Sequence, residues 1–298
     1  MNVLVATDFS DESKAALRWG AFLADQLGSK LIVVHVVDLA AGDNAWRVLV
    51  ETPEEIEQSA LVSARERLEE FVDETVKKHP SQVELRTVLG APVDEILAEA
   101  KHTDNVLIVA GTRGASRMKE IFLGNTARRL VRRSGVPVVL VPPEADVQTP
   151  QRMVVGVDFS GPSREAIRRA AMAARTYGAT VHAVYGYVLP EVSTVEGTML
   201  TNVERYDELV EEKRRKLEEI VAELDADDVI VEVSAVQQSP ERALIHTAED
   251  DGAQMIFVGT HGREGFKRFF LGNTAERVMR KSPVPVFVAP PVAEDSGS

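Results

Sequence analysis

Three glycines recur with the same spacing at two places in this 298-residue chain. Their pattern, Gly-x2-Gly-x9-Gly, occurs twice, 148 residues apart, at Gly111, Gly114 and Gly124 and at Gly259, Gly262 and Gly272. From 111 to 143, 18 of 33 positions are identical to those from 259 to 291. Glycines allow close backbone approach, and free N–H groups at a helix start attract anions. The pattern therefore predicts a phosphate-binding loop that is used twice.

Each half also places an aspartate directly after its first predicted strand. The sequence Thr-Asp-Phe-Ser at 7–10 recurs as Val-Asp-Phe-Ser at 157–160. Ligands of open parallel sheets bind beyond the carboxyl ends of the strands, so Asp8 and Asp158 should lie beside the glycine segments. A plainer interpretation stays open, because such an Asp also caps helices and glycines also form tight turns. Repetition of the whole arrangement favours a binding site.

These residues need a scaffold of alternating strands and helices. Short apolar runs typical of buried parallel strands cover 3–6, 31–37, 83–88, 106–110 and 136–141, and in the second half the order repeats from Met153 with 181–185, 229–236, 255–258 and 284–289. Helical patterns lie between them; Ser10 is predicted to cap the first, and others cover 125–133, 167–177, 203–224 and 241–249. The prediction is an α/β fold with two tandem open parallel five-stranded sheets and helices on both faces.

The repeat also fixes the predicted domains. We expect a first domain at 1–143, a proline-rich polar linker at 144–151, a second domain at 152–293 and a flexible tail at 294–298. The net charge of −13 argues against nucleic acid and anionic membranes as partners. The absence of cysteine excludes disulfides and thiolate metal sites, and no apolar stretch is long enough to span a membrane. The expected location is the cytoplasm.

The aspartates, the glycine pattern and the ending Ser-Gly-Val-Pro-Val-Val-Leu-Val-Pro at 134–142 closely resemble the universal stress proteins in their tandem two-domain form. The resemblance implies an adenine nucleotide α-hydrolase-like fold with strand order 3-2-1-4-5 and, in one branch of the family, bound ATP with Mg²⁺ or Mn²⁺ on its phosphates. It assigns nucleotide contacts in the first half to Thr7, Asp8, Val36, Gly111, Gly114, Gly124, Asn125 and Thr126. In the second half it assigns them to Val157, Asp158, Gly186, Gly259, Gly262, Gly272, Asn273 and Thr274.

The chain departs from the ATP-binding pattern after the third glycine of each copy. The family pattern continues with Ser or Thr, whereas Asn125 and Asn273 stand here, each followed by threonine. An Asn side chain still donates to phosphate, and the backbone amides are unchanged. The first half fits the family better, because it carries Gly-Ala-Pro at 90–92 where the second half has Gln-Ser-Pro at 238–240. We therefore expect one occupied site and one weak one.

Cations near the glycines are candidates for neutralising a triphosphate: Arg113, Arg117, Lys119, His261, Arg263, Lys267 and Arg268. Basic residues on the last helices are better explained by the helix dipole and by solubility. The six histidines show no metal spacing, and neither a nucleophile elbow nor a Walker A loop is present. No dedicated catalytic apparatus is visible, so any ATP hydrolysis would be slow.

The last strand of each half is apolar and has proline at its second position, at 137 and 285, which fits an edge strand. In the family this strand makes the dimer contact, so we expect the two halves to form an internal pseudo-dimer; further pairing of whole chains stays open.

Three functions remain open from the sequence. The preferred one is a regulatory stress-response protein that binds ATP or a related adenine nucleotide. The second is an interaction protein whose glycine loops bind nothing, which the two asparagines favour. The third is a slow ATPase or a self-phosphorylating protein with Thr126 or Thr274 as acceptor.

Overall fold

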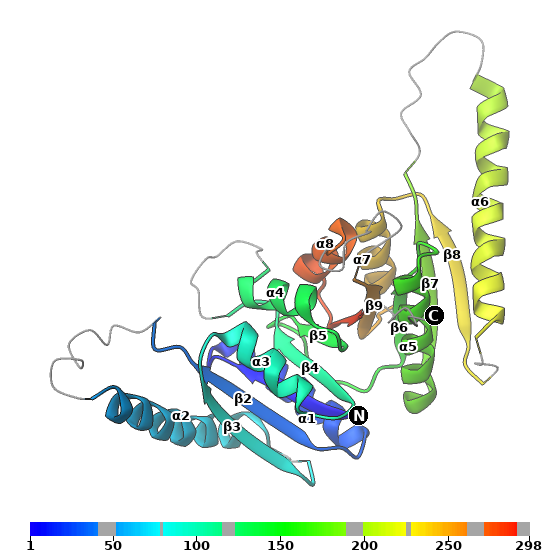
Figure 1. Cartoon of the computed structure of the whole chain (residues 1–298). Coiled ribbons are helices and arrows are strands. Elements are labelled where there is room, and N and C mark those ends of the chain that lie inside the picture. Colours follow the sequence, from blue (N-terminus) through cyan, green and yellow to red (C-terminus); the bar gives the residue numbers. More distant parts are fainter. Residues whose placement is uncertain are drawn as a thin grey trace, which may run out of the picture. The chain divides into compact units, whose positions relative to one another are not determined.

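A computed structural model of the chain describes residues 1–40, 52–77, 80–114, 123–188, 199–224, 228–260 and 271–290. The chain divides into two compact units, Met1–Val147 and Gln148–Ser298 (Figure 1). We call them the first and the second unit and describe each by itself.

The first unit alternates strands with helices along its whole length. Its elements are β1 (Asn2–Thr7), α1 (Asp11–Gln26), β2 (Leu31–Val37), α2 (Pro53–Thr75), β3 (Val83–Leu89), α3 (Pro92–Lys101), β4 (Val106–Gly111), α4 (Asn125–Arg133) and β5 (Val138–Val141). The strands are ordered β3-β2-β1-β4-β5, and each neighbouring pair is parallel.

The second unit repeats this architecture. Its elements are β6 (Arg152–Gly156), α5 (Gly161–Tyr177), β7 (Thr180–Gly186), α6 (Met199–Ala222), β8 (Val231–Val236), α7 (Pro240–Asp250), β9 (Met255–Gly259), α8 (Asn273–Lys281) and β10 (Val286–Ala289). The strands are ordered β8-β7-β6-β9-β10, again in parallel pairs. The predicted fold class and the strand order 3-2-1-4-5 are therefore confirmed for both units.

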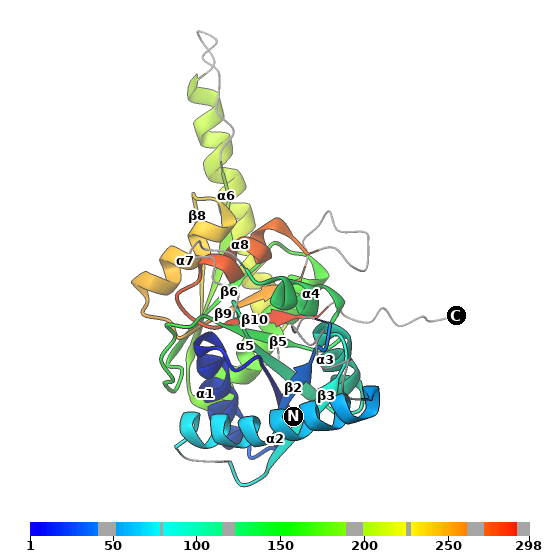
Figure 2. The same cartoon turned by 90° about the vertical axis from the view of Figure 1, so that its left-hand side faces the viewer.

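Helices cover both faces of each sheet. In the first unit α1 packs beside α2, and α3 packs beside α4. Because parallel crossovers are right-handed, the change of winding direction after β3 puts these two pairs on opposite faces (Figure 2). Fully buried side chains such as Leu4, Trp19 and Ile108 fill the core of the first unit. In the second unit α7 and α8 pack together in the same way as α3 and α4.

Several element boundaries differ from the sequence-based prediction. The last strands begin at Val138 and Val286, after the prolines rather than around them. Proline has no N–H to donate to a strand ladder, yet the Pro137 carbonyl still accepts from the Ile108 N–H at 3.0 Å. Helix α6 begins at 199 rather than 203 and ends at 222. In the described part of the chain, none of the helices combines the length and apolar character that a membrane crossing needs.

Candidate functional site

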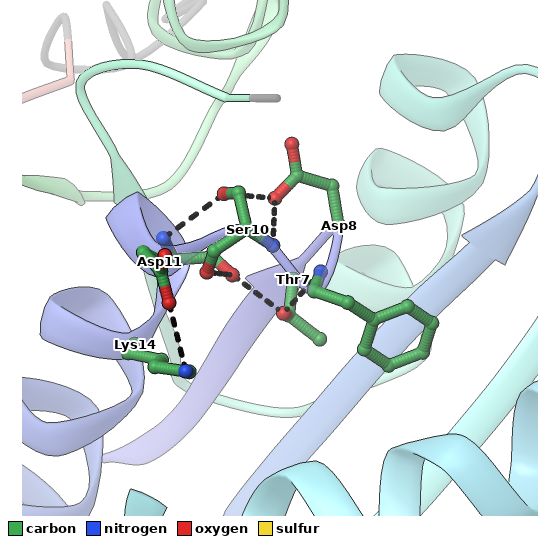
Figure 3. Close-up of polar contacts among 7 residues, drawn as sticks. Thr7, Asp8, Ser10, Asp11 and Lys14 are labelled. Carbon is green, nitrogen blue, oxygen red and sulfur yellow. Dashed lines mark hydrogen bonds and ion pairs between the residues drawn. The ribbon is translucent and has the colours of Figure 1, made fainter.

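The aspartate after β1 organises the turn that leads into α1. Asp8 Oδ1 accepts hydrogen bonds from the Ser10 N–H at 3.1 Å and from the Ser10 hydroxyl at 2.5 Å (Figure 3). Ser10 in turn caps α1, because its Oγ accepts from the Ser13 N–H at 3.2 Å. Asp8 is therefore not the helix cap itself. It is exposed, and it holds the capping serine in place.

The turn is strained at the residue between Asp8 and Ser10. Phe9 has a φ of +63°, a left-handed conformation that costs a non-glycine residue about 1 kcal/mol or more. Its ring stacks on His35 at the end of β2, with ring centres 4.0 Å apart, and the Arg67 guanidinium lies 4.5 Å from the ring centre. Packing from two elements thus compensates the strain and fixes where the Asp8 side chain emerges.

The second unit builds the same turn. Asp158 Oδ1 accepts from the Ser160 N–H at 3.0 Å and from its hydroxyl at 2.5 Å. Phe159 has a φ of +68°, and its ring lies against Tyr185, with ring centres 5.1 Å apart. We call residues 7–10 and 157–160 the strand-end turns. Their recurrence with the same backbone strain shows that the arrangement is a property of both units.

The two turns differ in the residue that precedes the aspartate. The Thr7 hydroxyl accepts from the Phe9 N–H at 3.1 Å and lies 2.9 Å from the Ser13 hydroxyl. Val157 has no hydroxyl, and there the Asp158 N–H donates to Ser163 Oγ at 3.3 Å. Both Thr7 and Val157 are buried. A substitution at this position therefore changes the internal hydrogen bonds and leaves the aspartate in its place.

The first glycine segment lies against the first strand-end turn. A Cβ atom on Gly114 would lie 2.5 Å from Asp8 Oδ2, too close for any other residue without movement of the carboxylate. Asp8 and Gly114 are far apart in the sequence, and the sheet brings them together because β1 and β4 are neighbours. This contact brings the aspartate motif and the glycine segment of the first unit side by side.

Helix α4 in the first unit and helix α8 in the second each begin directly after a glycine, without a side-chain cap from the described residues. Their N-cap residues are Gly124 and Gly272. The Gly124 N–H donates to the Thr112 carbonyl at 2.8 Å, and the Gly272 N–H donates to the Thr260 carbonyl at 2.9 Å. The asparagines that follow, Asn125 and Asn273, are exposed. Helix starts of this kind present N–H groups and a positive dipole end to an anion.

Other glycines assigned to the site are needed by the protein itself. A Cβ on Gly111 would lie 2.9 Å from the Arg113 carbonyl oxygen, and one on Gly259 would lie 2.7 Å from the Pro162 backbone. A Cβ on Gly186 would meet the backbone of Pro240 at 2.6 Å. Packing alone therefore explains glycine at these three positions, and they carry no separate evidence for a ligand.

His35 and Val36 form the β2 side of the site. Burial lowers the pKa of the His35 imidazole, and the nearby Arg67 guanidinium lowers it further, against the opposing effects of the Thr7 carbonyl and Asp8. The neutral ring donates from Nδ1 to the Thr7 carbonyl at 2.9 Å. His35 thus ties β2 to β1. Val36 is buried beside it in β2.

Several predicted site residues lie outside the described residues: Gly262, Arg117, Lys119, His261, Arg263, Lys267 and Arg268. Arg113 is described, and its Nη2 atom lies 3.3 Å from Glu144 Oε1. Thr126 is exposed and Thr274 half-buried, both in the first turn of their helices. Within the described ranges, no group of three His, Asp or Glu side chains is placed to hold a metal ion.

A set of linked hydrogen bonds around His182 in the second unit was not predicted from the sequence. His182 Nδ1 donates to Asp251 Oδ2 at 2.7 Å, and its Nε2 lies 2.9 Å from Ser234 Oγ. The position that corresponds to Ser234 in the first unit is Arg86, which pairs with Glu84 at 2.7 Å. Each unit thus gives the polar side chain at this position of β3 or β8 a partner, so the hydrogen bonds around His182 are a structural feature of the sheet.

Comparison with known proteins gives one consistent result. The model of the universal stress protein family matches residues 1–142 and again 150–290. A universal stress protein of Mycobacterium tuberculosis strain H37Rv is 30% identical over 96% of both chains, and one of Mycolicibacterium smegmatis is 28% identical over 97% of both. The crystal structure of a universal stress protein from Archaeoglobus fulgidus superposes with a TM-score of 0.65 at 22% identity, covering 97% of this chain and 98% of that one.

Proposed function

The chain belongs to the universal stress protein family in its tandem form, and we propose that it binds ATP or a related adenine nucleotide at the strand-end turn of its first unit. Family membership confirms the resemblance seen in the sequence. The proposal that a nucleotide binds rests mainly on the contact between Asp8 and Gly114. That contact puts a carboxylate, a glycine segment and the open start of α4 at one edge of the sheet.

The parts of this edge have complementary chemistry. Asp8 Oδ1 is committed to Ser10, whereas Oδ2 is the carboxylate oxygen that faces Gly114. A carboxylate oxygen accepts a hydrogen bond from an amino or hydroxyl group of a nucleoside. The N–H groups that open α4 suit a phosphate, and a divalent cation such as Mg²⁺ or Mn²⁺ would share its charge. A nucleotide has both kinds of group.

Two measurements test the proposal. Denaturing the purified protein and analysing the released small molecules by mass spectrometry reports any nucleotide carried through purification. Calorimetric titration with ATP and Mg²⁺ then compares the wild type with Asp8→Asn. The asparagine still accepts from Ser10 but replaces Oδ2 with a donor, so the turn survives while ATP affinity falls by about tenfold or more.

Asp158→Asn is the matched control in the second unit, since the same turn exists there. It reports whether the second site contributes. Absence of both co-purified nucleotide and any thermal shift with ATP and Mg²⁺ would contradict the proposal and support the interaction protein with non-binding loops. Phosphate release from ATP that Asp8→Asn abolishes would instead support the slow ATPase. The pairing of the two units through their last strands and the cytoplasmic location stay predictions.

A further inference from the structure

The second unit contains a cavity of about 640 Å³ that the two site motifs do not use. Residues that follow β8, the first turns of α7 and the end of α8 line it. Three basic side chains face it, Arg242 and His246 from α7 and Lys281 from α8, and all three are exposed. We call this the α7/α8 cavity.

The first unit has a different pair of side chains at the corresponding place. Asp94 in α3 corresponds to Arg242, and Arg133 in α4 corresponds to Lys281, both at the 148-residue offset. Asp94 Oδ1 and Arg133 Nη2 form an ion pair at 2.6 Å. In the second unit the acid of this pair has become a second base. Within the described part of the chain, no ion pair joins Arg242 or Lys281 to a carboxylate.

Other positions around the cavity have changed in the same direction. Each is small or apolar in the first unit and polar in the second: Gly90 to Gln238, Ala91 to Ser239, Val93 to Glu241 and Ala98 to His246. Four such changes together with the reversed charge are confined to one face of one unit. A face under selection only for solubility has no need to gather several bases around one cavity, because like charges that share a site repel each other.

The one acid in the cavity wall does not cancel this charge. Glu241 Oε1 lies 3.0 Å from Arg277 Nη1, and its side chain is only 10% exposed. Burial raises the pKa of this carboxyl, but hydrogen bonds from a backbone N–H and from Arg277 outweigh burial and hold the pKa below its ordinary value. Glu241 is therefore ionised and neutralised by a base outside the cavity wall, so among the described residues of the wall no carboxylate balances the charges of Arg242 and Lys281.

One further group in the wall suits an oxygen-rich ligand. Gln238 lines the cavity and is half-buried, and its amide offers both a donor and an acceptor to a hydroxyl group.

We propose that the α7/α8 cavity binds a small phosphate monoester that carries a hydroxyl group, at a site separate from the strand-end turns. Guanidinium and ammonium groups are the usual partners of a phosphate. The phosphate would lie against Arg242 and Lys281, and a hydroxyl of the ester would reach Gln238. The cavity has room for a molecule of this size.

Calorimetric titration of the full chain with glycerol 3-phosphate, at constant ionic strength, tests this site. Arg242→Asp restores the acid and base pairing of the first unit and should raise the Kd by about tenfold or more. Lys281→Gln should weaken binding in the same direction. Arg280→Gln is the matched control, because Arg280 is an exposed base next to Lys281 that does not line the cavity. Its Kd should stay within about twofold of the wild-type value.

Any one of three outcomes would overturn the proposal. The first is that the wild type binds no glycerol 3-phosphate, and the second is that Arg242→Asp and Arg280→Gln weaken binding equally. The third is that Asp8→Asn removes the binding that Arg242→Asp leaves intact. The last outcome would place the phosphate at the strand-end turn. ATP titration of Arg242→Asp separates the two sites, because ATP affinity should not change there. A thermal unfolding midpoint at or above that of the wild type shows that the variant is folded.

Discussion

Asp8 and Asp158 hold the same strained turn in the two units, whereas the acid and base pair of Asp94 and Arg133 in the first unit corresponds to two bases in the second. The turn has been kept at a cost, because each copy has a phenylalanine with positive φ. The helical face has been rebuilt without a change in fold. The comparison separates what the architecture requires of both units from what one unit has acquired, and paired substitutions can test each side of it.

The largest difference in stability should come from helices α1 and α5. Trp19 is fully buried in α1, and the corresponding residue of α5 is Arg169, which pairs with Glu165 at 2.6 Å. Trp19→Ala leaves a large cavity and should cost the first unit about 3–5 kcal/mol of unfolding free energy. Arg169→Ala should cost the second unit under about 1 kcal/mol. Hydrogen exchange read by mass spectrometry assigns each loss to its unit, and equal losses would contradict the comparison.

The rebuilt face should depend on Arg277. Arg277→Ala leaves the buried Glu241 carboxylate without its partner and should destabilise the second unit by about 1–3 kcal/mol. Arg129→Ala, at the corresponding exposed position of the first unit, should stay within about 0.5 kcal/mol. Denaturant unfolding measures both variants. Adding Glu241→Val, which restores the residue type of the first unit, should recover the loss; failure to recover it would show that the ion pair is not the cause.

The shared turn should respond equally in the two units. Ser10→Ala and Ser160→Ala each remove the cap of the following helix and the donor to the aspartate, so each should cost about 1 kcal/mol. Unit-resolved hydrogen exchange reports the two losses. A loss in only one unit would mean that the turns are alike in geometry but not in energy.

The smallest expected effect is a pH dependence confined to the first unit. Burial holds the pKa of His35 below its ordinary value of 6.5, so folding favours the neutral ring. This contribution is fully present above pH 6.5 and is lost as the pH falls through 6.5 towards the folded pKa. His35→Tyr introduces the residue that Tyr185 provides in the second unit and should flatten the stability of the first unit over this range. An unchanged pH profile would assign the dependence to other groups.

Local patterns were enough to predict most of the fold. The apolar runs at 31–37 and the helix at 125–133 were predicted with the bounds that the structure has. The starts of β5 at Val138 and of β10 at Val286 were missed, because a pattern of apolar residues does not show where ladder hydrogen bonds begin beside a proline. The capping role of Ser10 was predicted, while the role of Asp8 in holding Ser10 depends on side-chain geometry.

The sequence by itself determined the duplicated α/β architecture and the family, because periodicity, turn residues and repetition are local features of the chain. Only the tertiary structure decided which distant residues touch. The contact of Gly114 with Asp8, the pairing of Asp94 with Arg133 and the meeting of Arg242 and Lys281 at one cavity all follow from strand order and helix packing. A reversed charge at one position has meaning only when the partner it faces is known, and the partner is set by the fold.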